Sequence, residues 1–327
     1  MKRLVYLGLA LAGFLSITAF LVSLYRSWQL YLFSPKAGST LVYHFSLYIP
    51  DNRNSFFLGI IRGAEQAAAE LDSAVSIHSI DPARNELEIA AFTGADGVIV
   101  CPYLDDALAR RQLEKLSDYQ IPAVLINHNL SSEQPWPFIG INTYDMGRRI
   151  GLILAEDSTE KITLAVVYSD KAPGIYAERE LVEMGISASL EDRLSGPVIG
   201  YRTNLNPLDA EALLVDIFRS PGSRNKEPGE TEQPAINTIV FTDPEDTIAA
   251  SQTLVDLNLV GRVRIIGFGA DPGVLESLQK EIVSASVVID SEKIGYEAVH
   301  SLAALRTSGY TSALIDTGIE IIFRRQQ

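Results

Sequence analysis

Short apolar runs of strand character alternate with longer amphipathic stretches of helical character from residue 41 almost to the end of the chain. The first three units are a strand at 41–49, a helix at 55–72 and a strand at 74–80. Strands that alternate with helices at this spacing predict parallel sheets covered by helices on both faces. The 327 residues hold too many such strands for one small sheet, so we expect two doubly wound α/β halves.

One segment interrupts this pattern. Residues 220–235 read SPGSRNKEPGETEQPA, which has no apolar period and is rich in Pro, Gly and charged residues. A surface loop and a linker between domains are both compatible with this composition. The strand-like run NTIVFT that follows continues the alternation, which favours a loop inserted within a domain.

The N-terminal segment is apolar, since Leu4 to Tyr25 contains no charged residue. A helix of roughly 22 apolar residues is long enough to cross a ~30 Å hydrocarbon core. No small-x-small cleavage site follows at a suitable place, which favours an uncleaved anchor over a cleaved signal or a buried core helix. Lys2 and Arg3 precede the run, which favours a cytoplasmic N-terminus. We expect residues 1–35 to be a membrane anchor or signal segment, and the rest to be extracytoplasmic, or periplasmic if the segment is cleaved.

Composition and motifs exclude several classes of function. The formal net charge of −14 and the lack of a Lys and Arg cluster argue against a protein that wraps nucleic acid. Cys101 is the only cysteine, which excludes an internal disulfide and a cysteine-rich metal cluster. There is no G-x-S-x-G or H-E-x-x-H motif, the four histidines lack metal-ligand spacing, and GFGADPG breaks the G-x-G-x-x-G pattern. We expect no enzyme activity, metal or cofactor.

Several phrases occur in the same order as in one known family. They are IPDNRNSFFLGIIRGAEQAAAEL, DGVIVCPYLDDA with IPAVLINHN, FIGINTYDMGRRIGLILAE, VRIIGFGADPGVLESLQK and SASVVIDSEKIGYEAVHSL, all between residues 41 and 323. This part of the chain resembles the periplasmic sugar-binding proteins of the ribose-binding type, whose fold is shared by the effector domains of lactose-repressor-like regulators.

The resemblance implies two α/β lobes of the periplasmic binding protein-like I fold, joined by a hinge of three crossing strands. It implies a first lobe at 40–141 plus 290–316 and a second lobe at 143–288 plus 318–327. In this family hinge rotation closes the lobes over a ligand, and ligand contacts from both lobes select the closed state. The implied function is to bind a small sugar-like or other polar ligand for a sugar ABC permease or for a membrane sensor such as a histidine kinase.

Candidate ligand contacts of the first lobe follow from position and from the resemblance. Ligands of doubly wound sheets bind beyond the carboxyl ends of the strands, where Asn127 and His128 lie. The matching family positions hold an Asp and an Arg that contact sugar hydroxyls. The resemblance also matches Asn54 to the family's turn asparagine, and Phe56 and Phe57 to its aromatic wall. The alternative interpretations are a hydrogen-bonded loop pair, a helix cap and two core aromatic residues.

Four more residues are candidate contacts. Cys101 occupies a position that is a polar pocket residue in many relatives, and Arg179 matches the family's second-lobe arginine. Asp243 and Asp290 each stand beside a position that commonly contacts sugar. A buried strand-end thiol and a solvated helix face are the alternative interpretations of Cys101 and Arg179.

The chain departs from the family at three hydrogen-bonding positions. Pro244 stands where an amide is common, Gly269 where an Asp is expected, and Ile289 where a hinge Gln or Asp often lies. A buried hydroxyl without a partner costs on the order of 1–3 kcal/mol. We therefore expect a ligand other than ribose bound in the usual way, one that is less hydroxylated or held by the neighbouring acidic residues.

Two alternative functions remain open. The first is a protein that has kept the fold and lost its ligand, and that now serves as an interaction partner. A transcriptional regulator with this fold would need a DNA-reading headpiece, whereas the first 40 residues here are largely apolar.

Overall fold

The computed structural model describes residues 16–24, 42–50, 55–80, 86–102, 106–130, 136–157, 160–204, 206, 208–219 and 235–324. The chain divides into two compact units, Met1–Leu41 and Val42–Gln327. Asn54, residues 220–234 and most of the predicted anchor lie outside the described residues.

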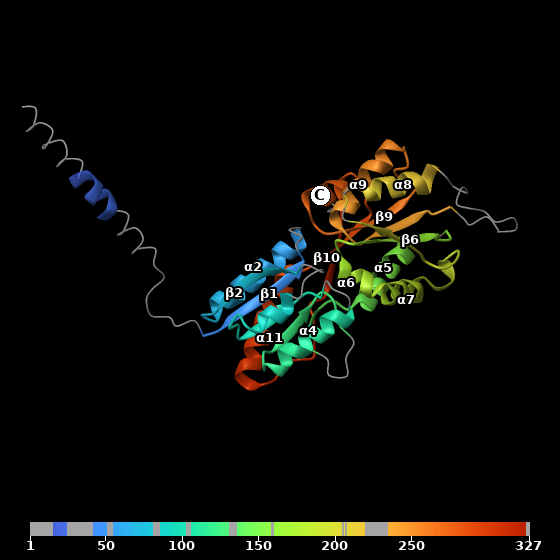
Figure 1. Cartoon of the computed structure of the whole chain (residues 1–327). Coiled ribbons are helices and arrows are strands. Elements are labelled where there is room, and N and C mark those ends of the chain that lie inside the picture. Colours follow the sequence, from blue (N-terminus) through green and yellow to red (C-terminus); the bar gives the residue numbers. More distant parts are fainter. Residues whose placement is uncertain are drawn as a thin grey trace, which may run out of the picture. The chain divides into compact units, whose positions relative to one another are not determined.

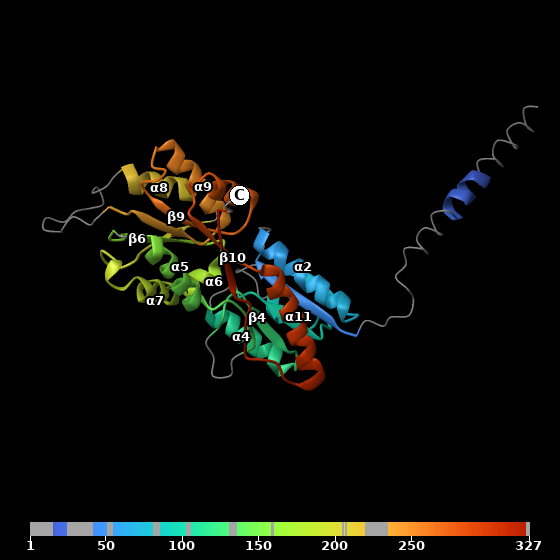
Figure 2. The same cartoon turned by 180° about the vertical axis from the view of Figure 1, so that it is seen from behind.

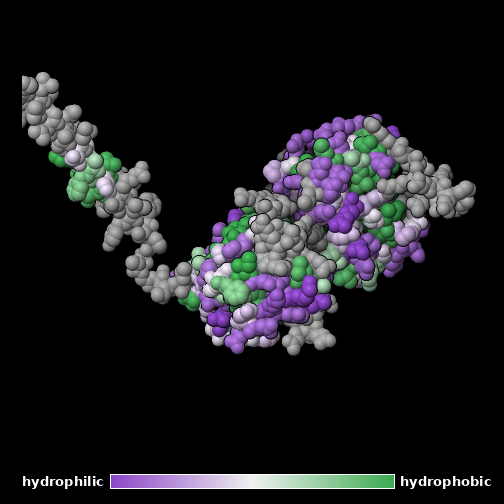
Figure 3. All heavy atoms as spheres, in the orientation of Figure 1, coloured by the Kyte–Doolittle hydropathy of each residue, from purple (hydrophilic) through white to green (hydrophobic). Residues whose placement is uncertain are grey.

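Of the first unit, residues 16–24 are described and are helical. Their exposed apolar side chains, which colour this helix green in Figure 3, are Ile17, Phe20, Leu21, Val22 and Leu24. No helix within the described ranges is long and apolar enough to cross a membrane.

The second unit contains two sheets of six strands each, as far as the chain is described (Figures 1 and 2). The first sheet has the order β2-β1-β3-β4-β5-β11, and all its pairs are parallel. Its strands are β1 (His44–Pro50), β2 (Ala74–Ile80), β3 (Gly97–Val100), β4 (Ala123–Ile126), β5 (Phe138–Gly140) and β11 (Leu314–Asp316). The helices of this lobe are α2 (Ser55–Glu70), α3 (Glu86–Ala90), α4 (Asp106–Asp118) and α11 (Ser291–Ser308).

The second sheet has the order β7-β6-β8-β9-β10-β12. Its strands are β6 (Leu164–Ser169), β7 (Ile199–Thr203), β8 (Thr238–Phe241), β9 (Arg264–Phe268), β10 (Ala285–Ile289) and β12 (Ile319–Phe323). Its helices are α5 (Thr143–Asp157), α6 (Pro173–Ala177), α7 (Arg179–Leu190), the 3₁₀ turn η1 (Glu191–Arg193), α8 (Asp209–Arg219), α9 (Pro244–Asp256) and α10 (Pro272–Gln279). The predicted pair of α/β lobes is therefore present.

One strand runs against the predicted parallel direction. β12 pairs antiparallel with β10 at the edge of the second sheet. The reason is its connection: β12 follows β11 of the first sheet after a two-residue turn, without a crossover helix that would reverse the chain direction.

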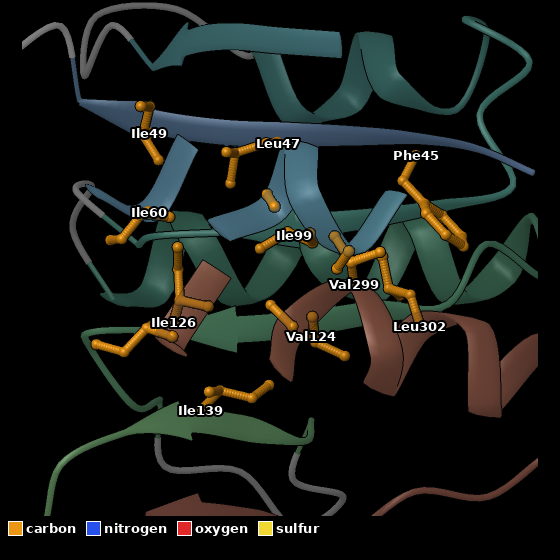
Figure 4. Close-up of a cluster of buried hydrophobic side chains, with 14 of the residues drawn as sticks. Phe45, Leu47, Ile49, Ile60, Ile99, Val124, Ile126, Ile139, Val299 and Leu302 are labelled. Atoms are coloured by element: carbon orange, nitrogen blue, oxygen red, sulfur yellow. The ribbon is translucent and has the colours of Figure 1, made fainter. Parts of the chain in front are cut away.

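The sheets are buried because helices cover both of their faces. β3, β4 and β8 are buried at every position, which explains their continuous apolar sequences GVIV, AVLI and TIVF. Figure 4 shows strand residues of the first lobe facing α2 and α11. The buried residues labelled there are Phe45, Leu47, Ile49, Ile60, Ile99, Val124, Ile126, Ile139, Val299 and Leu302.

Two close helix pairs complete the lobes: α2 packs on α11, and α5 packs on α7. Both contacts depend on glycine. A Cβ on Gly63 would overlap the backbone of Glu292, and one on Gly147 would overlap the backbone of Val182. The absence of a side chain lets the two backbones of each pair approach closely.

The chain passes between the two sheets three times. β5 leads into α5 through residues 141–142, β10 leads into α11 through Asp290, and β11 leads into β12 through residues 317–318. All three passages start at the carboxyl ends of strands, so these strand ends of both sheets lie beside the same passages.

Hydrogen bonds tie two of the passages together. The Thr317 N–H donates to the carbonyl oxygen of Gly140 at 2.7 Å. One carboxylate oxygen of Asp316 accepts from the backbone N–H groups of Asn142 at 3.3 Å and Gly318 at 2.9 Å.

Candidate ligand-binding site

A cavity of about 310 Å³ lies between the two sheets and is lined by residues of both lobes. Ser55, Phe56 and Asn127 line it from the first lobe, while Lys171 and Asp243 are among the lining residues of the second. The volume is at the lower end of the range for small-molecule sites. Most of these residues follow the carboxyl ends of strands, which is where doubly wound sheets bind ligands.

A larger and open hollow of about 1620 Å³ runs along α10 and β12. It is lined by the second lobe alone, at an edge strand. Since no residue of the first lobe lines this hollow, the cavity between the lobes is the better candidate site.

Asn127 turns the chain at the end of β4. It has a φ of 63°, in the left-handed region that Asn tolerates better than most residues. Its amide nitrogen lies 3.8 Å from the sulfur of Cys101, which follows β3. Cys101 is fully buried, and burial raises the pKa of its thiol to about 12, so the thiol is neutral at physiological pH.

His128, the next residue, contacts a different group. Its Nε2 lies 3.0 Å from a carboxylate oxygen of Asp106 in the first turn of α4. Its Nδ1 is buried and has no hydrogen-bond partner among the residues that the structure describes, and His128 is not among the cavity-lining residues. Consecutive residues at a strand end point in different directions, which separates Asn127 from His128.

The two aromatic residues at the start of α2, Phe56 and Phe57, also point in different directions. Phe56 lines the cavity, whereas Phe57 is 1% exposed and belongs to the core of the first lobe. The two rings meet edge to face with centroids 5.3 Å apart. Phe57 thus supports the position of Phe56.

A buried ion cluster forms the polar wall of the second lobe. The ammonium of Lys171 lies 2.8 Å from Asp246, 3.2 Å from Asp243 and 3.2 Å from Glu245. Lys171 is 5% exposed and Asp246 is fully buried. Burial acts to lower the pKa of Lys171, but the hydrogen bond to Asp246 and the two Asp charges outweigh it and raise the pKa.

Asp243 has two structural partners besides this lysine. Its Oδ1 accepts from the backbone N–H groups of Glu245 at 3.0 Å and Asp246 at 3.1 Å, which caps the N-terminus of α9. Burial raises the pKa of Asp243, and the charge of Lys171 opposes that shift. The side chain of Asp246 also accepts a hydrogen bond from the hydroxyl of Thr203.

Two contacts join the lobes across the cavity. The hydroxyl of Ser55 donates to a carboxylate oxygen of Asp271 at 3.3 Å. A Cβ on Gly174 would overlap the backbone carbonyl of Asn127, so the start of α6 lies directly against the end of β4. Ser55 and Asn127 belong to the first lobe, whereas Asp271 and Gly174 belong to the second.

Arg179 and Asp290 are not among the cavity-lining residues. Arg179 begins α7, and its guanidinium carbon lies 5.0 Å from the ring centroid of Tyr176. Asp290 caps α11, where its side chain accepts from the backbone N–H of Lys293 at 2.9 Å. Of the predicted contacts, Phe56, Asn127 and Asp243 line the cavity, whereas Phe57, Cys101 and His128 are not among its lining residues.

The three departures noted in the sequence all line the cavity. Pro244, Gly269 and Ile289 present no polar side chain to it. Lys171 and Asp271 are lining residues that the sequence analysis missed. Lys171 lies two residues beyond β6 and Asp271 three residues beyond β9. Ligands of doubly wound sheets bind beyond the carboxyl ends of the strands, and this strand-end rule could have indicated both residues.

Solved structures resemble this chain over most of its length. A glucose-galactose binding protein from Geobacillus stearothermophilus, GanP, matches with a TM-score of 0.72 and 21% identity, covering 86% of this chain and 97% of that one. The myo-inositol binding protein of Caulobacter matches with a TM-score of 0.72 and 18% identity, covering 89% and 95%. A periplasmic ribose ABC transporter protein from Conexibacter woesei matches with a TM-score of 0.69 and 18% identity, covering 86% and 91%. These likenesses show the fold.

No curated protein matches the chain. The family model described as periplasmic binding protein domain matches residues 45–309, which is most of the chain and includes every residue that lines the cavity. The chain therefore belongs to the periplasmic binding protein domain family.

Proposed function

We propose that this protein is an extracytoplasmic substrate-binding protein that closes over a small sugar-like or other polar ligand. The observation that carries the proposal is the cavity of about 310 Å³ lined by both lobes, beside the three passages of the chain. A ligand there touches both lobes at once, so its binding energy favours the closed arrangement.

Hinge rotation about the three passages is the proposed motion, with lobes at 40–141 plus 290–316 and 143–288 plus 318–327. Residues 141–142, Asp290 and residues 317–318 would absorb the backbone changes, as short connecting segments do in hinged proteins. The contacts of Ser55 with Asp271 and of Gly174 with Asn127 would then form on closure.

The names of similar solved structures support the proposed ligand class and the proposed partner. The names of the similar solved structures mention glucose and galactose, myo-inositol and ribose, and several of them mention an ABC transporter. We propose a sugar-like ligand here, and delivery to an ABC permease or signalling to a membrane sensor kinase as the output. A fixed membrane anchor suits a one-to-one signalling complex, whereas a transport receptor gains from free diffusion.

The apolar run Leu4 to Tyr25 is the proposed single-pass anchor. Removing residues 1–33 should then yield a soluble monomer that keeps the melting temperature of the full chain measured in detergent. Size-exclusion chromatography with light scattering and calorimetry measure both. Aggregation of the shortened chain would instead assign the segment to the folded core.

The direct test of the proposed function is a thermal-shift screen of the full-length chain against pentoses, hexoses, inositols and other polyols. A ligand at 100 times its dissociation constant stabilises the folded state by about 2.7 kcal/mol, which raises the melting temperature by several degrees. Silence across the panel would favour the ligand-free interaction protein.

The variant Asn127→Gly tests whether a ligand found in this screen binds in the cavity. Glycine adopts the left-handed φ of this position without strain, so the empty protein should keep its melting temperature. Loss of one hydrogen bond of about 0.5–1.5 kcal/mol should weaken ligand binding roughly 2- to 10-fold in calorimetric titrations. Unchanged affinity would place the ligand elsewhere.

Lys171 should matter for folding as well as for the cavity. Lys171→Met leaves the carboxylates of Asp243 and Asp246 buried without their cation, which should cost about 3–5 kcal/mol in unfolding experiments. Lys280→Met is the matched control, because that lysine pairs with Glu276 on the surface; it should cost less than about 1 kcal/mol.

The cost of Lys171→Met should also depend on pH. The pKa of Asp243 is already raised in the folded state, and loss of the neighbouring ammonium raises it further. A carboxyl whose folded pKa exceeds its unfolded value loses stability as pH rises through the folded value. The deficit relative to wild type should therefore shrink as pH falls towards about 4. A deficit that is constant with pH would argue against the ion cluster as its cause.

A further inference from the structure

The cavity's lysine has no hydrogen-bond donor left for a ligand. An ammonium group carries three N–H donors, and that of Lys171 faces three carboxylates, those of Asp243, Glu245 and Asp246. The protein itself therefore satisfies the one cationic side chain among the described lining residues.

Two hydroxyl groups of the cavity are also occupied. Thr242 donates to the carbonyl oxygen of Val167 and accepts from the N–H of Ser169, each at 3.1 Å. The hydroxyl of Ser55 donates to Asp271. Because a hydroxyl has a single proton, neither side chain can donate to a ligand while these bonds persist.

Among the described lining residues, three acceptors remain available, beside two remaining donors, the hydroxyl of Ser291 and an amide N–H of Asn127. Every hydrogen bond and ion pair of the Asp243 side chain ends on Oδ1, which leaves Oδ2 without a partner among the described residues. Asp271 receives one hydroxyl on Oδ2, makes no cap bond to α10, and keeps Oδ1 open in the described part of the chain. The amide oxygen of Asn127 is a third acceptor with no partner within the described ranges.

The charged residues around the described part of the cavity carry a net negative charge. Among the described residues there, Lys171 contributes one positive charge, against the carboxylates of Asp243, Glu245, Asp246 and Asp271. Glu245 is about half exposed, but Asp243 and Asp246 are buried, where charges are weakly screened. A negatively charged ligand would be repelled there, and a cationic group would be attracted.

We propose that the ligand carries a protonated amine, as an amino sugar or amino polyol does, and that Asp271 and Asp243 receive its N–H groups. This inference rests on the proposed function and specifies its ligand class. Phe56 and Phe268, which also line the cavity, offer apolar ring surface to the carbon skeleton of such a ligand.

The test compares matched ligands on the full-length chain by isothermal titration. The probes are glucose and galactose, their 2-amino derivatives, the N-acetylated forms of these amines, and the corresponding uronic acids. The free amines should bind at least about 10-fold more tightly than the neutral sugars, with no measurable binding of the acids. Acetylation removes the positive charge and should abolish the preference.

Asp271→Asn is the informative variant, with Glu276→Gln as its control. The first removes a cavity charge while keeping the shape of the side chain, and Asp271 makes no cap bond that the fold needs. The second makes the same charge change on α10 outside the cavity, where Glu276 pairs with Lys280. Only Asp271→Asn should reduce the affinity ratio of amine to neutral sugar.

The outcomes distinguish a failure of this inference from a failure of the proposed binding function. Neutral sugars or acids that bind as tightly as the amines would overturn the inference and leave the binding protein intact. An amine preference that persists in Asp271→Asn would overturn the assigned contact. If no probe binds, the proposed function fails, and the inference fails with it.

Discussion

The three passages of the chain between the lobes constrain the rest of the second unit. Two of them are tied by the Thr317 bond to Gly140 and by the single carboxylate oxygen that Asp316 offers to Asn142 and Gly318. Because all three leave from the carboxyl ends of strands, the strand ends of both sheets come to lie beside the same cavity. The antiparallel direction of β12 follows from the same connection.

The ion cluster that forms the polar wall of the cavity stabilises the fold of the second lobe. A lysine that is 5% exposed is tolerated because three carboxylates surround its ammonium, and one of them, Asp243, also caps α9. The arrangement fixes the loops that follow β6 and β8, yet it uses up the donors of Lys171. Among the described lining residues, three acceptor oxygens remain open to a ligand, and two of them belong to the carboxylates of Asp243 and Asp271.

The sequence predicted the α/β lobes because period and segment length depend on local pattern, and continuous runs such as AVLI reflect strands buried on both faces. The strand-end rule also indicated Asn127 as a lining residue. It could not separate Asn127 from His128, or Phe56 from Phe57, because the direction of a side chain after a strand or at a helix start is decided by tertiary packing. Lys171 was missed for a related reason: its three partners lie more than 70 residues away in the chain, and no local pattern reveals them.

The central claim is that a ligand in the cavity brings the two lobes together. Cys101 is the only cysteine and is fully buried, so spin labels at Gln66→Cys on α2 and Gln252→Cys on α9 would report one distance between the lobes. Double electron-electron resonance with and without a saturating amount of the tightest ligand measures that distance. Closure predicts a ligand-bound distribution that is shorter and narrower than that of the empty protein. An identical distribution in both states would contradict the account, because binding would then involve no movement of one lobe towards the other.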